Sequence, residues 1–189
     1  YKKYFGQINN IYFNNSANKI NLSFVFGIAK VLKLNFKIVL NTISKFRGLD
    51  YRQQIIYKSK NLIIINDSKS TSLSSTKILL ESYENIYWIL GGLAKRGDKL
   101  ILNKKYFKKI RAYIYGKDRY FFSRIFFKKL ESKISKNLNE SLNLVFKDLN
   151  KDKKRKVILF SPSAASFDQF KNFEVRGLYF NKIIKKYIN

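Results

Sequence analysis

Hydrophobic positions in the first part of the chain recur at helical spacing. One apolar face across residues 18–34 predicts a helix, and its members are Leu22, Val25, Phe26, Ala29 and Leu32. A second short helix is predicted over residues 36–44. Residues 1–13 are polar and aromatic, and they are expected to contain the end of a strand around Ile8, Ile11 and Phe13. The loop 45–50, which contains Gly48, is the expected domain boundary.

Beyond that loop, short apolar runs alternate with amphipathic segments. The predicted strands are 52–58, 61–66, 86–90, 112–115, 133–135 and 157–160. The predicted helices are 72–82, 104–110, 119–130, 140–149 and 170–188. Strands separated by helices of about ten residues indicate an α/β fold with a mostly parallel sheet flanked by helices. In such sheets, ligands bind beyond the carboxyl ends of the strands.

Composition removes several classes of function. The 189 residues suffice for one domain, or for one domain plus part of another. The absence of Cys and His excludes thiolate or histidine metal sites, Ser–His–Asp triads and Cys–His dyads. The longest apolar runs are too short to span a membrane, and residues 1–10 lack the apolar region of a signal peptide. We therefore expect no membrane association and a cytoplasmic location.

The charge of the chain is strongly positive, with 39 Lys and Arg against 12 Asp and Glu. A net charge of +27 is typical of proteins that bind nucleic acid. However, Lys far outnumbers Arg, and Asn, Ile, Phe and Tyr are abundant, which is the palette of AT-rich codons. Base-reading proteins depend on Arg for bidentate contacts, so we interpret the charge mainly as compositional bias. The densest basic run, 147–156, is expected to be a solvated loop.

Three predicted strand ends carry residues that suit anion binding. The first is Asn66-Asp67-Ser68-Lys69-Ser70-Thr71, which places a carboxylate, an ammonium and hydroxyls just before a helix. An alternative interpretation is an ordinary helix cap at Ser70 or Thr71.

The second strand end runs from Gly91 to Asp98, with glycines that let a ligand approach the backbone and a cation at Lys95. The third runs from Ser161 to Asp168, where small hydroxyl residues expose backbone N–H groups; simple turn chemistry is its alternative. Together they predict an anion-binding crevice at one side of one sheet. A P-loop, Gly-x-x-x-x-Gly-Lys-[Ser/Thr], does not occur in the sequence.

These segments resemble the Mur ligases of peptidoglycan synthesis. The carboxyl-terminal segment Ser161-Pro-Ser-Ala-Ala-Ser-Phe-Asp-Gln-Phe-Lys-Asn-Phe-Glu-Val-Arg-Gly177 is similar to the signature of the branch that adds D-glutamate. Four further segments occur in the order found in that family. They are the two other strand ends, the segment Phe46-Arg-Gly-Leu-Asp-Tyr-Arg52, and the segment Asn18-Lys-Ile-Asn21. Two positions depart from it, because Ala17 and Tyr51 stand where the family usually has His.

The resemblance implies that residues 1–45 are the helical end of a central ATPase domain. Residues 46–189 would form the Rossmann-like, amino-acid-binding domain. The implied reaction is the ATP-dependent addition of D-glutamate to UDP-N-acetylmuramoyl-L-alanine through an acyl phosphate, by a monomer that uses ATP and Mg²⁺. The family's P-loop and magnesium ligands would lie upstream, so residues 1–189 alone are expected to lack ligase activity, and we assign them no catalytic or metal-binding residue.

The resemblance also implies roles for single residues. Asn18 and Asn21 would contact the nucleotide, Arg52 the ATP phosphates, and Asp67 the ribose. The residues expected around D-glutamate are Lys69, Thr71, Lys95, Ser166, Phe167 and Phe173. Of these, Thr71 and Lys95 would hold one carboxylate, and Ser166 with the backbone of Phe167 and Phe173 the other. Two alternatives stay open: a related Mur or folylpolyglutamate-type ligase, and a non-enzymatic basic module that binds nucleic acid.

Overall fold

The computed structural model describes residues 2–14, 16–149 and 155–188. They fall into two compact units, Tyr1–Leu49 and Asp50–Asn189, which are described separately. Among the described residues, no helix is long and apolar enough to cross a membrane.

The first unit is helical. Its elements are α1 (Lys2–Phe5), the 3₁₀ turn η1 (Ile11–Asn14), α2 (Ser16–Val31) and α3 (Phe36–Lys45). The two predicted helices are confirmed. Asn35 caps α3 by accepting hydrogen bonds from two backbone N–H groups. Helix α2 ends three residues earlier than predicted because Lys33 adopts a left-handed conformation (φ 53°) and the Leu34 N–H closes back onto the Ala29 carbonyl.

The strand end predicted within residues 1–13 is wrong, since the described residues there form α1 and η1. The Asn10 side chain accepts from Tyr12 N and donates to the carbonyls of Ile43 and Phe46, which fixes a turn instead of an extended strand. The buried face of α2 is also narrower than predicted. Leu22, Phe26 and Ala29 are buried, whereas Val25 and Leu32 are exposed.

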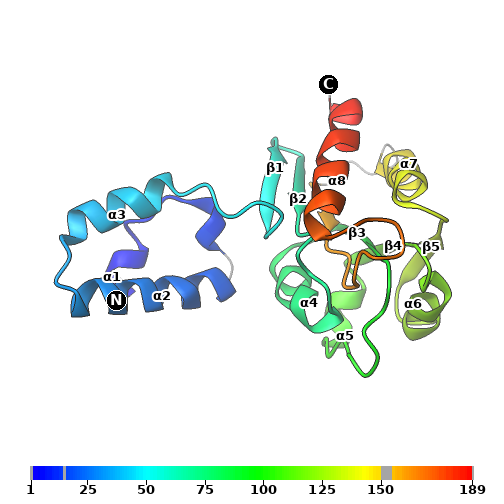
Figure 1. Ribbon diagram of the computed structural model, residues 1–189, viewed down its shortest axis with the longest axis horizontal. Helices are drawn as coiled ribbons and strands as arrows, with labels where there is room; N and C mark the ends of the chain where they lie inside the picture. The colour runs from blue at the N-terminus through cyan, green and yellow to red at the C-terminus, as the bar shows by residue number, and fades with distance from the viewer. Residues whose placement is uncertain (1, 15, 150–154, 189) are drawn as a thin grey trace. The chain divides into compact units, whose positions relative to one another are not determined.

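The second unit contains a six-stranded sheet in the order β1-β2-β6-β3-β4-β5 (Figure 1). The strands are β1 (Gln54–Lys58), β2 (Leu62–Asn66), β3 (Ile86–Gly91), β4 (Ile110–Tyr115), β5 (Glu131–Ile134) and β6 (Lys156–Phe160). Strand β1 pairs antiparallel with β2, with a bulge between Ile55 and Tyr57, and the other pairings are parallel. The predicted α/β fold with a mostly parallel sheet is therefore confirmed.

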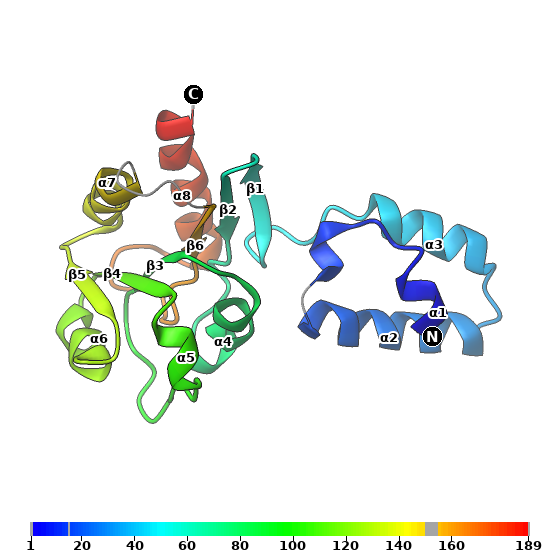
Figure 2. The same ribbon diagram turned by 180° about the vertical axis from the view of Figure 1, so that it is seen from behind.

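Helices cover both faces of this sheet (Figures 1 and 2). They are α4 (Leu73–Ser82), α5 (Lys104–Phe107), α6 (Arg119–Phe126), α7 (Leu138–Leu149) and α8 (Phe173–Ile188). One buried cluster joins α4 and α6 to alternate strand residues such as Trp88. A second cluster joins α7 and α8 to the residues between them, such as Tyr87 and Ile89. This alternation is what a sheet with two covered faces requires.

Several boundaries differ from the predicted ones. Helix α5 ends at Phe107 because Ile110 already pairs with Ile86 at the start of β4. Helix α6 ends at Phe126, just before Lys128 adopts a left-handed conformation (φ 57°), and β5 begins earlier than predicted. Helix α8 begins at Phe173 rather than at residue 170. Within the basic run 147–156, residues 150–154 lie outside the described part of the chain, while 147–149 still belong to α7.

Candidate functional site

Three loops meet at one edge of the sheet because β2, β6 and β3 are adjacent and parallel. Asp67 N donates to the Phe160 carbonyl at 2.7 Å, and Gly91 N donates to the Pro162 carbonyl at 2.9 Å. Leu93 and Ala165 exchange two backbone hydrogen bonds of 2.9 Å. The structure thus brings together the three segments that the sequence analysis singled out.

The two glycines of this edge serve the packing of the loops. Gly91 and Gly92 adopt φ values of 142° and 129°, which disfavour any residue with a side chain. A Cβ at Gly91 would lie 2.0 Å from the Tyr115 carbonyl oxygen, and one at Gly92 would lie 2.2 Å from that of Ala165. Close approach of neighbouring backbone therefore requires glycine at both positions.

Asp67 lies inside this edge, with 6% of its surface exposed. Its Oδ1 accepts from Gln53 N at 3.1 Å and its Oδ2 accepts from Ser161 Oγ at 2.8 Å. Burial raises the pKa of Asp67 to about 7, although these two hydrogen bonds and the charges of Arg52 and Arg176 oppose the rise. Both oxygens thus already bond within the protein, and each has one further lone pair that could accept from another donor.

Thr76 is the centre of a buried chain of hydroxyl groups. Its Oγ1 lies 2.7 Å from Ser70 Oγ, 2.8 Å from Ser161 Oγ and 2.6 Å from Ser163 Oγ. These bonds tie the loop after β2 to the loop after β6 through the first turns of α4. The cap interpretation for Ser70 or Thr71 is wrong, because Ser72 occupies the N-cap of α4.

Arg176 on α8 is a residue that the sequence analysis missed. Its guanidinium is fully buried and donates to Ser68 Oγ (3.0 Å), the Ser68 carbonyl (2.7 Å) and the Ala164 carbonyl (2.9 Å). The neighbouring Tyr115 is also buried, and burial raises its pKa to about 12. Helical spacing was the available signal: Arg176 shares a face with the buried Phe180, Ile183 and Ile184.

The residues expected around an amino-acid substrate are all at or near this edge. Lys69 is half-buried, and its Nζ lies 4.0 Å from the centre of the Phe173 ring. The Phe173 carbonyl accepts from Ser68 Oγ at 2.8 Å. Ser166 is buried in the loop after β6, whereas the side chains of Thr71, Lys95 and Phe167 are exposed.

The residues expected around a nucleotide are divided between the two units. Asn18 and Asn21 belong to the first unit: Asn18 is buried and donates to the Tyr12 carbonyl at 2.7 Å, while Asn21 is exposed. In the second unit, Arg52 is exposed beside Asp67. The side chain of Ala17 lies outside those the structure describes.

Tyr51 packs against α8 within the second unit. A Cβ at Gly177 would lie 2.3 Å from its ring, so Gly177 leaves room for this aromatic side chain. The Tyr51 carbonyl accepts a hydrogen bond from Lys69 N at 3.0 Å.

Comparison with known proteins points to the same family as the sequence motifs. No family model matches the chain. It is 34% identical over 173 residues to the UDP-N-acetylmuramoylalanine–D-glutamate ligase of Wolbachia from Brugia malayi, covering 92% of this chain and 35% of the relative. The ligase of the same name from Rickettsia prowazekii is 37% identical over 169 residues, covering 88% and 38%. The chain is a homologue of the Mur ligases. It spans just over a third of the length of these curated relatives.

Solved structures support the fold assignment. UDP-N-acetylmuramate-alanine ligase MurC from Thermotoga maritima superposes with a TM-score of 0.62 at 16% identity, covering 92% of this chain and 38% of that one. MurF from Acinetobacter baumannii gives a TM-score of 0.63 at 13% identity, with coverages of 90% and 38%. At such low identity these Mur ligase structures show the fold alone.

The chemistry available at this edge is ion binding and positioning. Its polar groups are hydroxyls, backbone N–H groups and the cations of Lys69, Lys95 and Arg52. Within the described ranges, no three acidic side chains cluster in a way that could hold a metal ion.

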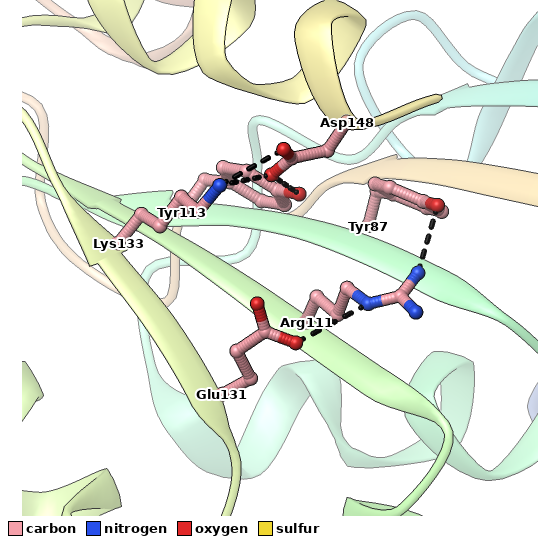
Figure 3. Close-up of polar contacts among 6 residues, drawn as sticks. All are labelled: Tyr87, Arg111, Tyr113, Glu131, Lys133 and Asp148. Carbon is pink, nitrogen blue, oxygen red and sulfur yellow. Dashed lines mark hydrogen bonds and ion pairs between the residues drawn. The ribbon is translucent and has the colours of Figure 1, made fainter. Parts of the chain in front are cut away.

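A second polar cluster lies away from this edge, between the sheet and α7 (Figure 3). Asp148 on α7 accepts from Tyr113 Oη at 2.8 Å and from Lys133 Nζ at 2.6 and 2.9 Å. Beside it, Arg111 donates to Tyr87 Oη at 2.8 Å and lies 3.4 Å from a Glu131 carboxylate oxygen. Burial and the neighbouring Asp148 raise the pKa of Tyr113, so this phenol stays protonated. The sequence analysis did not single out this cluster, and its contacts indicate that it fastens α7 to the sheet.

Proposed function

We propose that this chain supplies the D-glutamate-binding part of an ATP-dependent ligase of peptidoglycan synthesis. Its other substrate would be UDP-N-acetylmuramoyl-L-alanine, and a cytoplasmic location follows from the nucleotide substrates of that reaction. Residues 46–189 would be the amino-acid-binding domain, and residues 1–45 would be the end of the central ATP-binding domain. The names of the homologous ligases support this assignment.

The observation that carries the proposal is the shared edge of β2, β6 and β3. It places Lys69 and Thr71, Lys95, and Ser166 on three adjacent loops. D-Glutamate is a dicarboxylate and needs two anion sites. Thr71 and Lys95 would hold one carboxylate, and Ser166 with the backbone of Phe167 and Phe173 would hold the other.

In the proposed reaction, ATP phosphorylates the carboxylate of the sugar-linked substrate, the amine of D-glutamate attacks the acyl phosphate, and phosphate leaves. The residues of this chain would orient the amine and neutralise charge rather than transfer protons. Arg52 would contact the phosphates of ATP and Asp67 its ribose, while Asn18 and Asn21 would contact the nucleotide from the first unit. Residues 1–189 contain no P-loop sequence, so ligase activity is not expected from this stretch by itself.

The experiment that tests the proposal is titration calorimetry of residues 1–189 with D-glutamate at physiological ionic strength. We expect saturable binding that is stronger than for L-glutamate. Lys95→Met and Thr71→Val should each weaken binding about tenfold, because each removes a hydrogen bond to a charged carboxylate. Lys108→Met is the control, since it removes an exposed cation next to the amino end of β4.

Two results would contradict the proposal. One is the absence of saturable D-glutamate binding, and the other is an equal loss of affinity in the Lys108→Met control. Tight duplex DNA binding that falls steeply with salt, without D-glutamate binding, would favour the basic nucleic-acid-binding module instead.

A further inference from the structure

We propose that two carboxylates, Asp98 and Asp118, act as positioning residues that hold the Lys95 loop against the carboxyl edge of the sheet. The loop spans residues 92–98. The inference rests on the proposed function, because the purpose of this positioning is to present the Lys95 ammonium to a substrate carboxylate.

Asp118 holds the beginning of the loop. It occupies the N-cap of α6, yet its side chain makes no hydrogen bond to that helix. Its Oδ2 accepts instead from Ala94 N at 2.8 Å, and its own N–H donates to the Gly92 carbonyl at 3.2 Å. A residue placed to cap a helix is thus used to fix the backbone next to Lys95.

Asp98 holds the end of the loop. Its carboxylate accepts from Leu73 N and, at 3.4 Å, from Ser74 N. These are the first N–H groups of α4, where the helix dipole favours a negative charge. The loop therefore attaches itself to α4 through its own carboxylate, while the N-cap hydroxyl of Ser72 accepts a 3.4 Å bond from Ser75 N.

Between these two attachments the chain makes one tight turn. Asp98 N donates to the Lys95 carbonyl at 3.3 Å, and Gly97 adopts the left-handed conformation (φ 76°) that such a turn needs. Lys95, Arg96 and Gly97 are all exposed, and no described residue accepts a hydrogen bond or ion pair from the Lys95 ammonium. The backbone on both sides of Lys95 is therefore fixed, while the ammonium itself stays free. A backbone that is ordered before binding lowers the entropy cost of binding an anion.

The test combines Asp98→Asn and Asp118→Asn with Lys95→Met in residues 1–189. Glu84→Gln is the matched control, since it removes the same charge from an exposed side chain next to the amino end of β3. D-Glutamate affinity is measured by NMR titration. In parallel, mass spectrometry follows tryptic cleavage after Lys95 and Arg96, and the fluorescence of the single, buried Trp88 reports whether each variant is folded.

We expect each Asp→Asn variant to bind D-glutamate about 5- to 20-fold more weakly than the wild-type chain, and Glu84→Gln to bind it equally well. In the Lys95→Met background the same changes should cost no further affinity, because both carboxylates act through Lys95. Trypsin should cut after Lys95 and Arg96 faster in the Asp→Asn variants, with other sites unchanged.

Additive losses in the Lys95→Met background, or faster cleavage at every site, would overturn the inference in favour of a general structural role. An Asp98→Glu variant, which keeps the charge, should lose less affinity than Asp98→Asn; an equal loss would also count against the inference. If the wild-type chain does not bind D-glutamate, the proposed function fails together with the role of Lys95. The trypsin comparison then decides separately whether the two carboxylates hold the loop.

Discussion

Two polar networks in the second unit contain similar side chains but bond to different kinds of partner. At the carboxyl edge, Asp67 and Arg176 bond mainly to backbone atoms and hydroxyls of the loops. Under α7, the bonds of Asp148 run to the side chains of Tyr113 and Lys133 (Figure 3). The first network is buried, whereas the Lys133 side chain in the second remains 39% exposed.

The difference shows which part of the structure each kind of hydrogen bond can fix in place. A side chain that bonds to backbone groups of two loops fixes the path of both chains, and its loss leaves buried backbone acceptors without partners. A side-chain pair near solvent fixes only the distance between two elements, and water can replace either partner. The carboxyl edge should therefore be the more sensitive of the two to substitution.

The largest effect at a fixed pH is expected for Arg176→Met. It removes three buried hydrogen bonds and should lower the free energy of unfolding of the second unit by about 3 kcal/mol. Urea unfolding followed by Trp88 fluorescence measures this, because the only tryptophan is buried in that unit. Arg124→Met, at an exposed position on α6, is the control. Equal losses in both variants would remove the distinction drawn for the carboxyl edge.

A pH-dependent effect is expected for Asp67→Asn. The pKa of Asp67 rises from 3.8 to about 7 on folding, so between these values the folded state keeps a proton that the unfolded state has lost. Stability from this group is complete below pH 4, decreases as the pH rises towards 7, and then stays constant. The slope is at most about 1.4 kcal/mol per pH unit.

Unfolding free energies of the wild-type chain and Asp67→Asn between pH 4 and 8 test this. The Asn variant should gain stability relative to the wild-type chain as the pH rises from 4 to 7. A difference that stays constant over this range, or that changes in the opposite direction, would show that Asp67 is already ionised in the folded protein.

The smallest effect is expected for Tyr113→Phe. Asp148 keeps both hydrogen bonds from Lys133, so losing the phenol hydroxyl should lower the free energy of unfolding by about 1 kcal/mol. Amide exchange should accelerate in α7 but not in α4. A loss as large as that of Arg176→Met would contradict the view that this network only fastens one helix.

Much of the fold could be predicted because the strand residues of this chain are distinctive. The apolar runs at Ile63–Ile65 and Val157–Phe160 are short and rich in β-branched residues, which favours buried strands, and the helices between strands indicate parallel pairing. Boundaries were less predictable. In the segment 104–110, Tyr106, Phe107 and Ile110 stand at helical spacing, but pairing of Ile110 with Ile86 overrides that local preference.

The location of the candidate site could be predicted from the sequence, but its hydrogen-bond network could not. Strand order makes the three loops adjacent, and their composition was visible in the sequence. The hydrogen-bond partners were not, because Asp67 and Ser161 are 94 residues apart and Arg176 and Ser68 are 108 apart. The resemblance to Mur ligases implies a ligand contact for Asp67. Its hydrogen bonds to other residues of the chain form only when the loops pack together.

The two edge strands of the sheet have a consequence for the behaviour of the protein at high concentration. Strand β1 carries a bulge, and β5 has only four residues, with charged side chains at Glu131 and Lys133. Short, bulged or charged edges resist the addition of a strand from another copy. Aggregation through this sheet should therefore require unfolding first, when apolar runs such as those of β2 and β6 leave their neighbours.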